Sequence, residues 1–152
     1  MIILNKNISV EENIDDLLYN NDIKVIEYDG FDKVTALSFV ADGEKYVALK
    51  SCLDEDKRVL AKMHEYEHHK LQLFHKLEEQ IGNIGRVEEK VKRETMYDFL
   101  PEPKLRSLII RNGTFDPSVL AEESVFTAEE IGYAERLYYE IKGMEAPQIG
   151  QD

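Results

Sequence analysis

Residues 64–68 read His-Glu-Tyr-Glu-His, a match to the pattern His-Glu-x-x-His. On a helix, residues four apart lie side by side, so His64 and His68 can bind the same zinc ion. Glu65 lies about a quarter turn round from His64. Its carboxylate can there act as a general base on a water whose pKa the metal lowers. The pattern therefore predicts a zinc site with hydrolytic chemistry.

A catalytic zinc site usually has three protein ligands and one open position, so a third ligand is required. Glu88 is in helical register with Val91 and Thr95, which places it at the edge of an inward face. Glu89 pairs with Arg93 on the next turn and points outward. We therefore favour Glu88 as the third ligand and keep Glu89 as the alternative.

Two more histidines lie close to the motif. His69 falls off the apolar stripe of the motif helix and is predicted to lie at the surface. His75 is two turns beyond His68 on the same helix, too far to replace it as a ligand. A short pattern of this kind also occurs by chance on charged helices. The position of the motif argues against a chance match. Imidazoles on a core-facing stripe need partners, and one shared cation satisfies two of them.

Two helices are needed to position these residues. The sequence changes from a strand-like to a helix-like period at residue 54, and residues 54–80 predict one helix with the motif on its apolar face. Gly82 and Gly85 predict a break. A second helix over 86–100 then ends at Pro101. The candidate ligands would thus come from two successive helices.

The rest of the chain predicts a small sheet before the motif and more helices after it. A short amphipathic helix is expected over 10–20. Runs with strand-like alternation follow at 23–28, 34–40 and 45–50. Asp42-Gly43 suits a hairpin turn, and a final helix is expected over 127–142. The fold class is therefore α+β, with a small three-stranded sheet, antiparallel or mixed, packed against a helical bundle that carries the motif.

Length and composition indicate one domain and argue against a nucleic-acid partner. The chain has 152 residues, and we expect a single domain over 1–143 and a flexible tail over 144–152. The formal net charge of −12 opposes binding to a phosphate backbone. The one cysteine, Cys52, cannot form an internal disulfide, and neither a leader nor a membrane-spanning stretch is visible. A cytoplasmic location without membrane association is expected.

With these features in place, the chain resembles the ImmA/IrrE family of zinc metallopeptidases, small intracellular proteins often associated with mobile elements and stress responses. The resemblance rests on a glycine-containing hairpin, ADGEKYVALKS, on the motif segment KRVLAKMHEYEHH, and on the segment EEKVKRETMYDFLP. Counting back from Pro101 places the family's ligand glutamate on Glu88. The chain departs from the family at Glu67, where glycine is frequent, and at Val91 and Lys92, where a small residue and asparagine are usual.

The resemblance implies a zinc-dependent endopeptidase that cleaves a regulatory protein such as a helix-turn-helix repressor. Cleavage would relieve repression of a prophage, another mobile element or a stress response. The two motif histidines and Glu88 would hold Zn²⁺, with Glu65 as the catalytic base. Tyr66 and Tyr97 are considered as oxyanion stabilisers, and neither is assigned. The alternative is a non-catalytic anti-repressor that keeps the fold and acts by contact alone.

Overall fold

The computed structural model describes residues 10–75 and 81–150, which belong to two compact units, Ile2–Thr95 and Met96–Asp152. In these ranges, six helices, a π-helical segment and a three-stranded sheet confirm the predicted α+β class. Within the described ranges, no helix is both long and apolar enough to cross a membrane. The single domain over 1–143 stays a prediction, and its first nine residues lie outside the described ranges.

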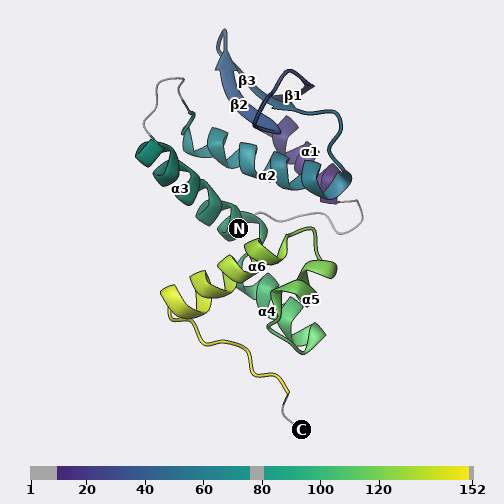
Figure 1. Ribbon diagram of the computed structural model, residues 1–152, viewed down its shortest axis with the longest axis vertical. Helices are drawn as coiled ribbons and strands as arrows, with labels where there is room; N and C mark the ends of the chain where they lie inside the picture. The colour runs from purple at the N-terminus through teal and green to yellow at the C-terminus, as the bar shows by residue number, and fades with distance from the viewer. Residues whose placement is uncertain (1–9, 76–80, 151–152) are drawn as a thin grey trace. The chain divides into compact units, whose positions relative to one another are not determined.

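The N-terminal unit begins with a helix and a sheet and continues into the motif helix (Figure 1). In chain order its elements are α1 (Val10–Asn20), β1 (Ile23–Glu27), β2 (Ala36–Ala41), β3 (Glu44–Leu49), α2 (Glu55–Leu71) and α3 (Ile81–Phe99), the last of which ends in the second unit. The first predicted helix and the three predicted strands are confirmed to within two residues at each end.

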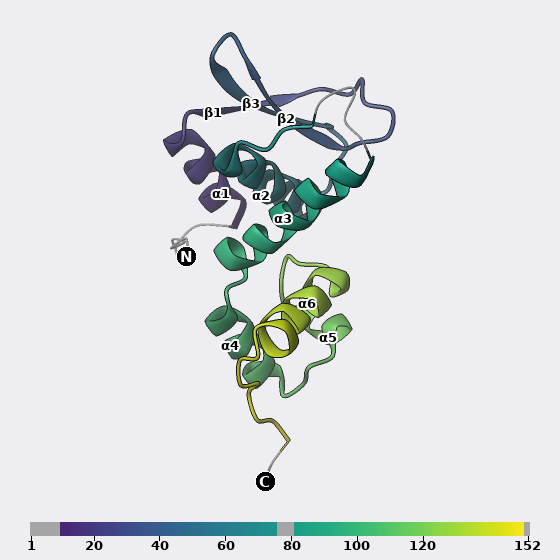
Figure 2. The same ribbon diagram turned by 90° about the vertical axis from the view of Figure 1, so that its left-hand side faces the viewer.

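The sheet is mixed, with β3 in the centre. Its strand order is β1-β3-β2, where β3 runs parallel to β1 and antiparallel to β2. Asp42 and Gly43 have φ of 52° and 76°, the two positive values that a type I′ hairpin turn needs. Ile23, Val47 and Leu49 share the inner face and are buried. That face covers α1 and α2 (Figure 2).

Helix α2 is shorter than the sequence predicts. It ends after Leu71, because Gln72 adopts the left-handed conformation with φ 55° and ψ 38°. The N–H of Leu73 then donates to the carbonyl oxygen of His68 at 3.0 Å, a bond typical of a Schellman motif. The prediction of one helix over 54–80 is therefore wrong, and its last five residues lie outside the described ranges.

The predicted break at Gly82 and Gly85 is also wrong, since α3 begins at Ile81 and runs through both glycines. A glycine inside a helix costs only about 1 kcal/mol relative to alanine. Packing of the inward face offsets that cost, and Val91 on this face is completely buried. Phe99 ends the helix two residues before Pro101, as predicted.

Helix α2 buries a broader face than the sequence predicts. Its buried apolar residues are Val59, Met63 and Tyr66. Of the two motif histidines predicted on the apolar face, His64 is half-buried and His68 is buried. His69, predicted to lie at the surface, is buried, and its Nε2 lies 2.7 Å from the Tyr46 carbonyl oxygen on β3. His69 is buried because the sheet covers the flank of α2 that carries it.

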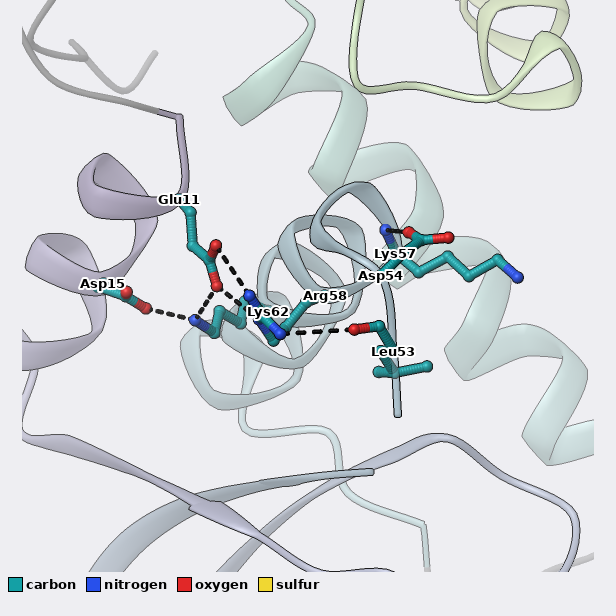
Figure 3. Close-up of polar contacts among 7 residues, drawn as sticks. All are labelled: Glu11, Asp15, Leu53, Asp54, Lys57, Arg58 and Lys62. Carbon is teal, nitrogen blue, oxygen red and sulfur yellow. Dashed lines mark hydrogen bonds and ion pairs between the residues drawn. The ribbon is translucent and has the colours of Figure 1, made fainter. Parts of the chain in front are cut away.

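A partly buried cluster of ion pairs joins α1 to α2 (Figure 3). Glu11 Oε1 accepts hydrogen bonds from Arg58 Nε at 2.6 Å and from Lys62 Nζ at 3.1 Å. Lys62 Nζ also donates to Asp15 Oδ1 at 2.7 Å, and Lys62 is only 5% exposed. The hydrogen bond from Arg58 lowers the pKa of Glu11 to about 2, burial opposes this, and Lys62 adds to the lowering. Two acids on α1 thereby compensate a cation buried on the motif helix.

The C-terminal unit is helical. After the end of α3 it contains α4 (Glu102–Asn112), α5 (Pro117–Glu122), α6 (Ala128–Glu135) and the π-helical η1 (Arg136–Ile141). The helix predicted over 127–142 is confirmed, with its second half wound as a π-helix. Tyr138 Oη donates to the carbonyl oxygens of Met96 and Leu100 at 3.1 and 2.8 Å, which satisfies acceptors at the end of α3.

The segment predicted as a tail, 144–152, contains no helix or strand up to residue 150. Arg106 donates a hydrogen bond to the Glu145 carbonyl oxygen, and Pro147 is buried. Its flexibility stays a prediction, and residues 151–152 lie outside the described ranges.

Glu11→Gln should lower the free energy of unfolding by about 1–2 kcal/mol at pH 7, because it removes the charge from bonds to two cations. Since the folded-state pKa of Glu11 is about 2 against an ordinary 4.5, its contribution is complete above pH 4.5 and is lost as pH falls toward 2. Urea unfolding of both proteins at pH 7 and pH 3 measures this.

Asp16→Asn, at an exposed position of the same helix, is the matched control and should leave stability unchanged at both pH values. A deficit of Glu11→Gln that stays the same from pH 7 to pH 3 would contradict the assignment of an ionised Glu11.

Candidate metal centre

The two motif histidines face each other one turn apart on α2. The Nε2 atoms of His64 and His68 are 3.3 Å apart, and the ring centroids are 4.9 Å apart. Glu88 on α3 reaches both rings: its Oε2 lies 2.8 Å from His64 Nε2, and its Oε1 lies 3.1 Å from His68 Nε2. The structure thus brings together the three side chains predicted as ligands. Glu89, the alternative, is exposed.

These separations suit a shared cation. Atoms bound about 2.0–2.2 Å from one tetrahedral zinc are roughly 3.3–3.6 Å from each other. The observed separations of 2.8, 3.1 and 3.3 Å fall within a few tenths of an ångström of that range. Two imidazoles and one carboxylate are also a donor set of catalytic zinc sites. The residues present therefore fit a zinc ion.

The backbone orients one of the rings. His68 Nδ1 lies 2.5 Å from the carbonyl oxygen of Leu73, just beyond the end of α2. A carbonyl can only accept, so Nδ1 carries the proton and donates it to Leu73. With Nδ1 protonated, Nε2 donates to Glu88 Oε1 when the ring is protonated, and the neutral ring would offer the Nε2 lone pair to a metal ion. Ligating histidines commonly have such a contact on the second nitrogen.

Hydrogen bonds and burial oppose each other in this cluster. Burial disfavours the charged form of Glu88, but hydrogen bonds from His64, His68 and His75 outweigh it and hold the pKa of Glu88 far below its ordinary value. Burial also disfavours protonated His68, yet its bonds to Glu88 and Leu73 raise the pKa of His68. Glu88 is therefore ionised, the form in which a carboxylate binds metal.

The predicted base lies beside the two rings. Glu65 is 7% exposed, and one of its carboxylate oxygens lies within 4.8 Å of ring nitrogens of both His64 and His68. Glu67, the departure from the family pattern, is completely buried and has Lys70 Nζ 3.7 Å from its Oε2. The extra carboxylate before the second histidine is thus paired with a cation of the same helix.

His75 is a fourth side chain of the cluster, although the sequence predicted it to lie too far away to replace His68 as a ligand. His75 Nε2 lies 2.5 Å from Glu88 Oε1, and the ring centroids of His75 and His68 are 5.2 Å apart. The prediction that His75 is too far away is wrong because it assumed a continuous helix. No pattern pointed to the true ending, since a left-handed cap is usually glycine or asparagine and here is Gln72.

The two tyrosines considered as oxyanion stabilisers lie in different units. Tyr66 is buried on α2 of the N-terminal unit. Tyr97 belongs to the C-terminal unit, where Lys142 Nζ lies 4.5 Å from its ring centroid. Neither the burial of Tyr66 nor the contact of Tyr97 assigns a catalytic role, so both residues stay unassigned.

The C-terminal unit has a separate cavity of about 390 Å³, bordered by Phe115, Pro117 and Glu135 among others. Burial, together with the charge of Asp116, raises the pKa of Glu135 to about 7. The acidic Glu135 does not suit binding of a nucleic-acid phosphate backbone. The residues that line the cavity include none of the predicted site residues.

Comparison of the chain with models of protein families, with curated proteins and with solved structures finds no match. Its function is therefore inferred from its own residues and from the family resemblance stated above.

Purified wild-type protein should carry about one zinc ion per chain, whereas His64→Ala and Glu88→Ala should lose most of it. Each variant removes one of three converging donors and should weaken affinity by at least about 10–100-fold. Elemental analysis after gel filtration, with chelator competition for affinity, measures both quantities.

Glu89→Ala is the control, because it removes a neighbouring exposed acid and should leave zinc content unchanged. Full zinc occupancy in His64→Ala or in Glu88→Ala would remove that residue from the centre.

Proposed function

We propose that this protein is a zinc-dependent endopeptidase in which His64, His68 and Glu88 hold the metal and Glu65 is the catalytic base. The observation that carries the proposal is the convergence of three donor atoms from two helices, with separations of 2.8 to 3.3 Å. Bound zinc would supply a Lewis acid that polarises a peptide carbonyl and lowers the pKa of water.

The protein's own residues would then position and transfer protons. The Glu65 carboxylate, close to both imidazoles, takes a proton from the attacking water and passes it to the leaving amine. Leu73 fixes the orientation of His68 through the Nδ1 contact at 2.5 Å. The His64 side chain is 35% exposed, so the cluster is accessible from solvent on that side, as a large substrate requires.

The substrate class comes from the resemblance to the ImmA/IrrE family. We infer a cytoplasmic regulatory protein, such as a helix-turn-helix repressor, whose cleavage relieves repression of a mobile element or a stress response. The net charge of −12 supports a protein rather than a nucleic-acid partner, because nucleic-acid binding depends on an excess of basic residues.

The alternative function is a non-catalytic anti-repressor that keeps the metal-binding fold. One observation favours it: His75 brings a third imidazole to Glu88, at 2.5 Å, and a fourth donor is typical of closed, structural zinc sites. Such a protein would bind the repressor and leave it intact.

Glu65→Gln should keep its zinc and lose at least about 100-fold in cleavage, because general-base catalysis typically contributes 10²–10⁴-fold. The measurement compares new protein N-termini in cells that express wild type, Glu65→Gln or the control Glu89→Gln. Wild type and control should generate the same new N-termini in a regulatory protein, and these should be absent with Glu65→Gln.

Cleavage by Glu65→Gln at the wild-type rate would overturn the role of Glu65. If the variant relieves repression while its partner stays uncut, the anti-repressor alternative is correct and the peptidase proposal is wrong.

A further inference from the structure

His75 occupies a special position because the chain reverses just before it. Gln72 ends α2 in the left-handed conformation, and Leu73 then bonds twice to His68. Its N–H donates to the His68 carbonyl oxygen at 3.0 Å, and its own carbonyl oxygen lies 2.5 Å from His68 Nδ1. These two bonds fix the segment against the second motif histidine and bring the next residues back toward the cluster.

The ring of His75 reaches the same oxygen as the ring of His68. His75 Nε2 and His68 Nε2 lie 2.5 and 3.1 Å from Glu88 Oε1. Donor atoms of His68, His75 and Glu88 all lie within 4.8 Å of one another, which is close enough for one ion to contact all three. The His75 side chain is 27% exposed, so it lies at the border of the cluster with solvent.

We propose that His75 is a fourth protein ligand of the metal centre, through Nε2, and closes the coordination position that a catalytic zinc site leaves open. This inference rests on the proposed metal centre. Three imidazoles and one carboxylate would supply the four protein donors that are typical of a closed zinc site. The resting protein is then a latent enzyme, and hydrolysis requires His75 to leave so that water can take its position.

The location of His75 is compatible with such an exchange. Glu88 and the two motif histidines are all carried by helices, α2 and α3, whereas His75 follows the end of α2 and lies outside any helix or strand. A ligand on a short irregular segment can leave without unfolding a helix. The other three donors would stay in place and keep the metal.

The four histidines of the chain provide a direct test by nitrogen-15 NMR of the ring nitrogens, recorded on the full-length protein without metal and with one equivalent of zinc. Zinc binding moves the signal of a ligating ring nitrogen to a characteristic position. The Nε2 signals of His64, His68 and His75 should move, whereas His69 should not respond, because its Nε2 is held at 2.7 Å by the Tyr46 carbonyl oxygen.

Two different failures can be told apart. If zinc moves none of the three signals, the metal centre itself is wrong, and the fourth ligand with it. If zinc moves His64 and His68 but leaves His75 unchanged, the metal centre holds and the fourth ligand is wrong. In that case His75 only donates a hydrogen bond to Glu88.

A second measurement uses chelator competition on His75→Ala. Loss of a ligand should weaken zinc affinity by more than the about 10–100-fold that loss of a hydrogen-bond partner of a ligand costs, while saturating zinc still fills one site per chain. A loss within about 100-fold, or none, would overturn the proposal. The far-ultraviolet circular dichroism of the variant, compared with that of the wild type, verifies that both are folded.

Discussion

The structure of the N-terminal unit depends on the placement of one carboxylate. Glu88 must come within about 3 Å of two imidazoles that precede it by 24 and 20 residues, and it comes from a different helix. An ionised carboxylate in a half-buried position is costly unless cations or hydrogen bonds compensate it. Three imidazoles supply that compensation, and a divalent cation shared among them would satisfy the whole group at once.

The rest of the unit holds α2 in the position that this placement requires. On one flank, His69 joins the helix to β3 through the Tyr46 carbonyl oxygen. On another, Lys62 and Arg58 bind the acids of α1. Lys62, His64, His68 and His69 lie within eight successive residues, so the same two turns of helix carry both the site and its anchors. A rigid support of this kind keeps the ligands preorganised.

Local sequence patterns predicted the parts of the site that depend on local geometry. The spacing of His64 and His68 follows from the helical repeat, and the register of Glu88 with Val91 identified its inward side. The Asp42-Gly43 turn and the three strands were likewise predictable, because their signals lie within a few residues.

The other parts depend on contacts between distant segments. His69 is buried because β3 covers it, and nothing near His69 in the sequence records that contact. The end of α2 at Gln72 depends on a left-handed residue that is neither glycine nor asparagine, so the position of His75 beside Glu88 could not be deduced. Helix propensity favoured continuation past Gln72, whereas the bonds between Leu73 and His68 hold the chain in another path.

The most direct test of the proposed metal centre is a crystal structure of the full-length protein grown with zinc, with anomalous diffraction recorded on both sides of the zinc absorption edge. A single strong anomalous peak about 2.0–2.2 Å from His64 Nε2, His68 Nε2 and a Glu88 carboxylate oxygen is the expected result. A peak elsewhere on the chain, with those three side chains bonded only to one another, would contradict the existence of the centre.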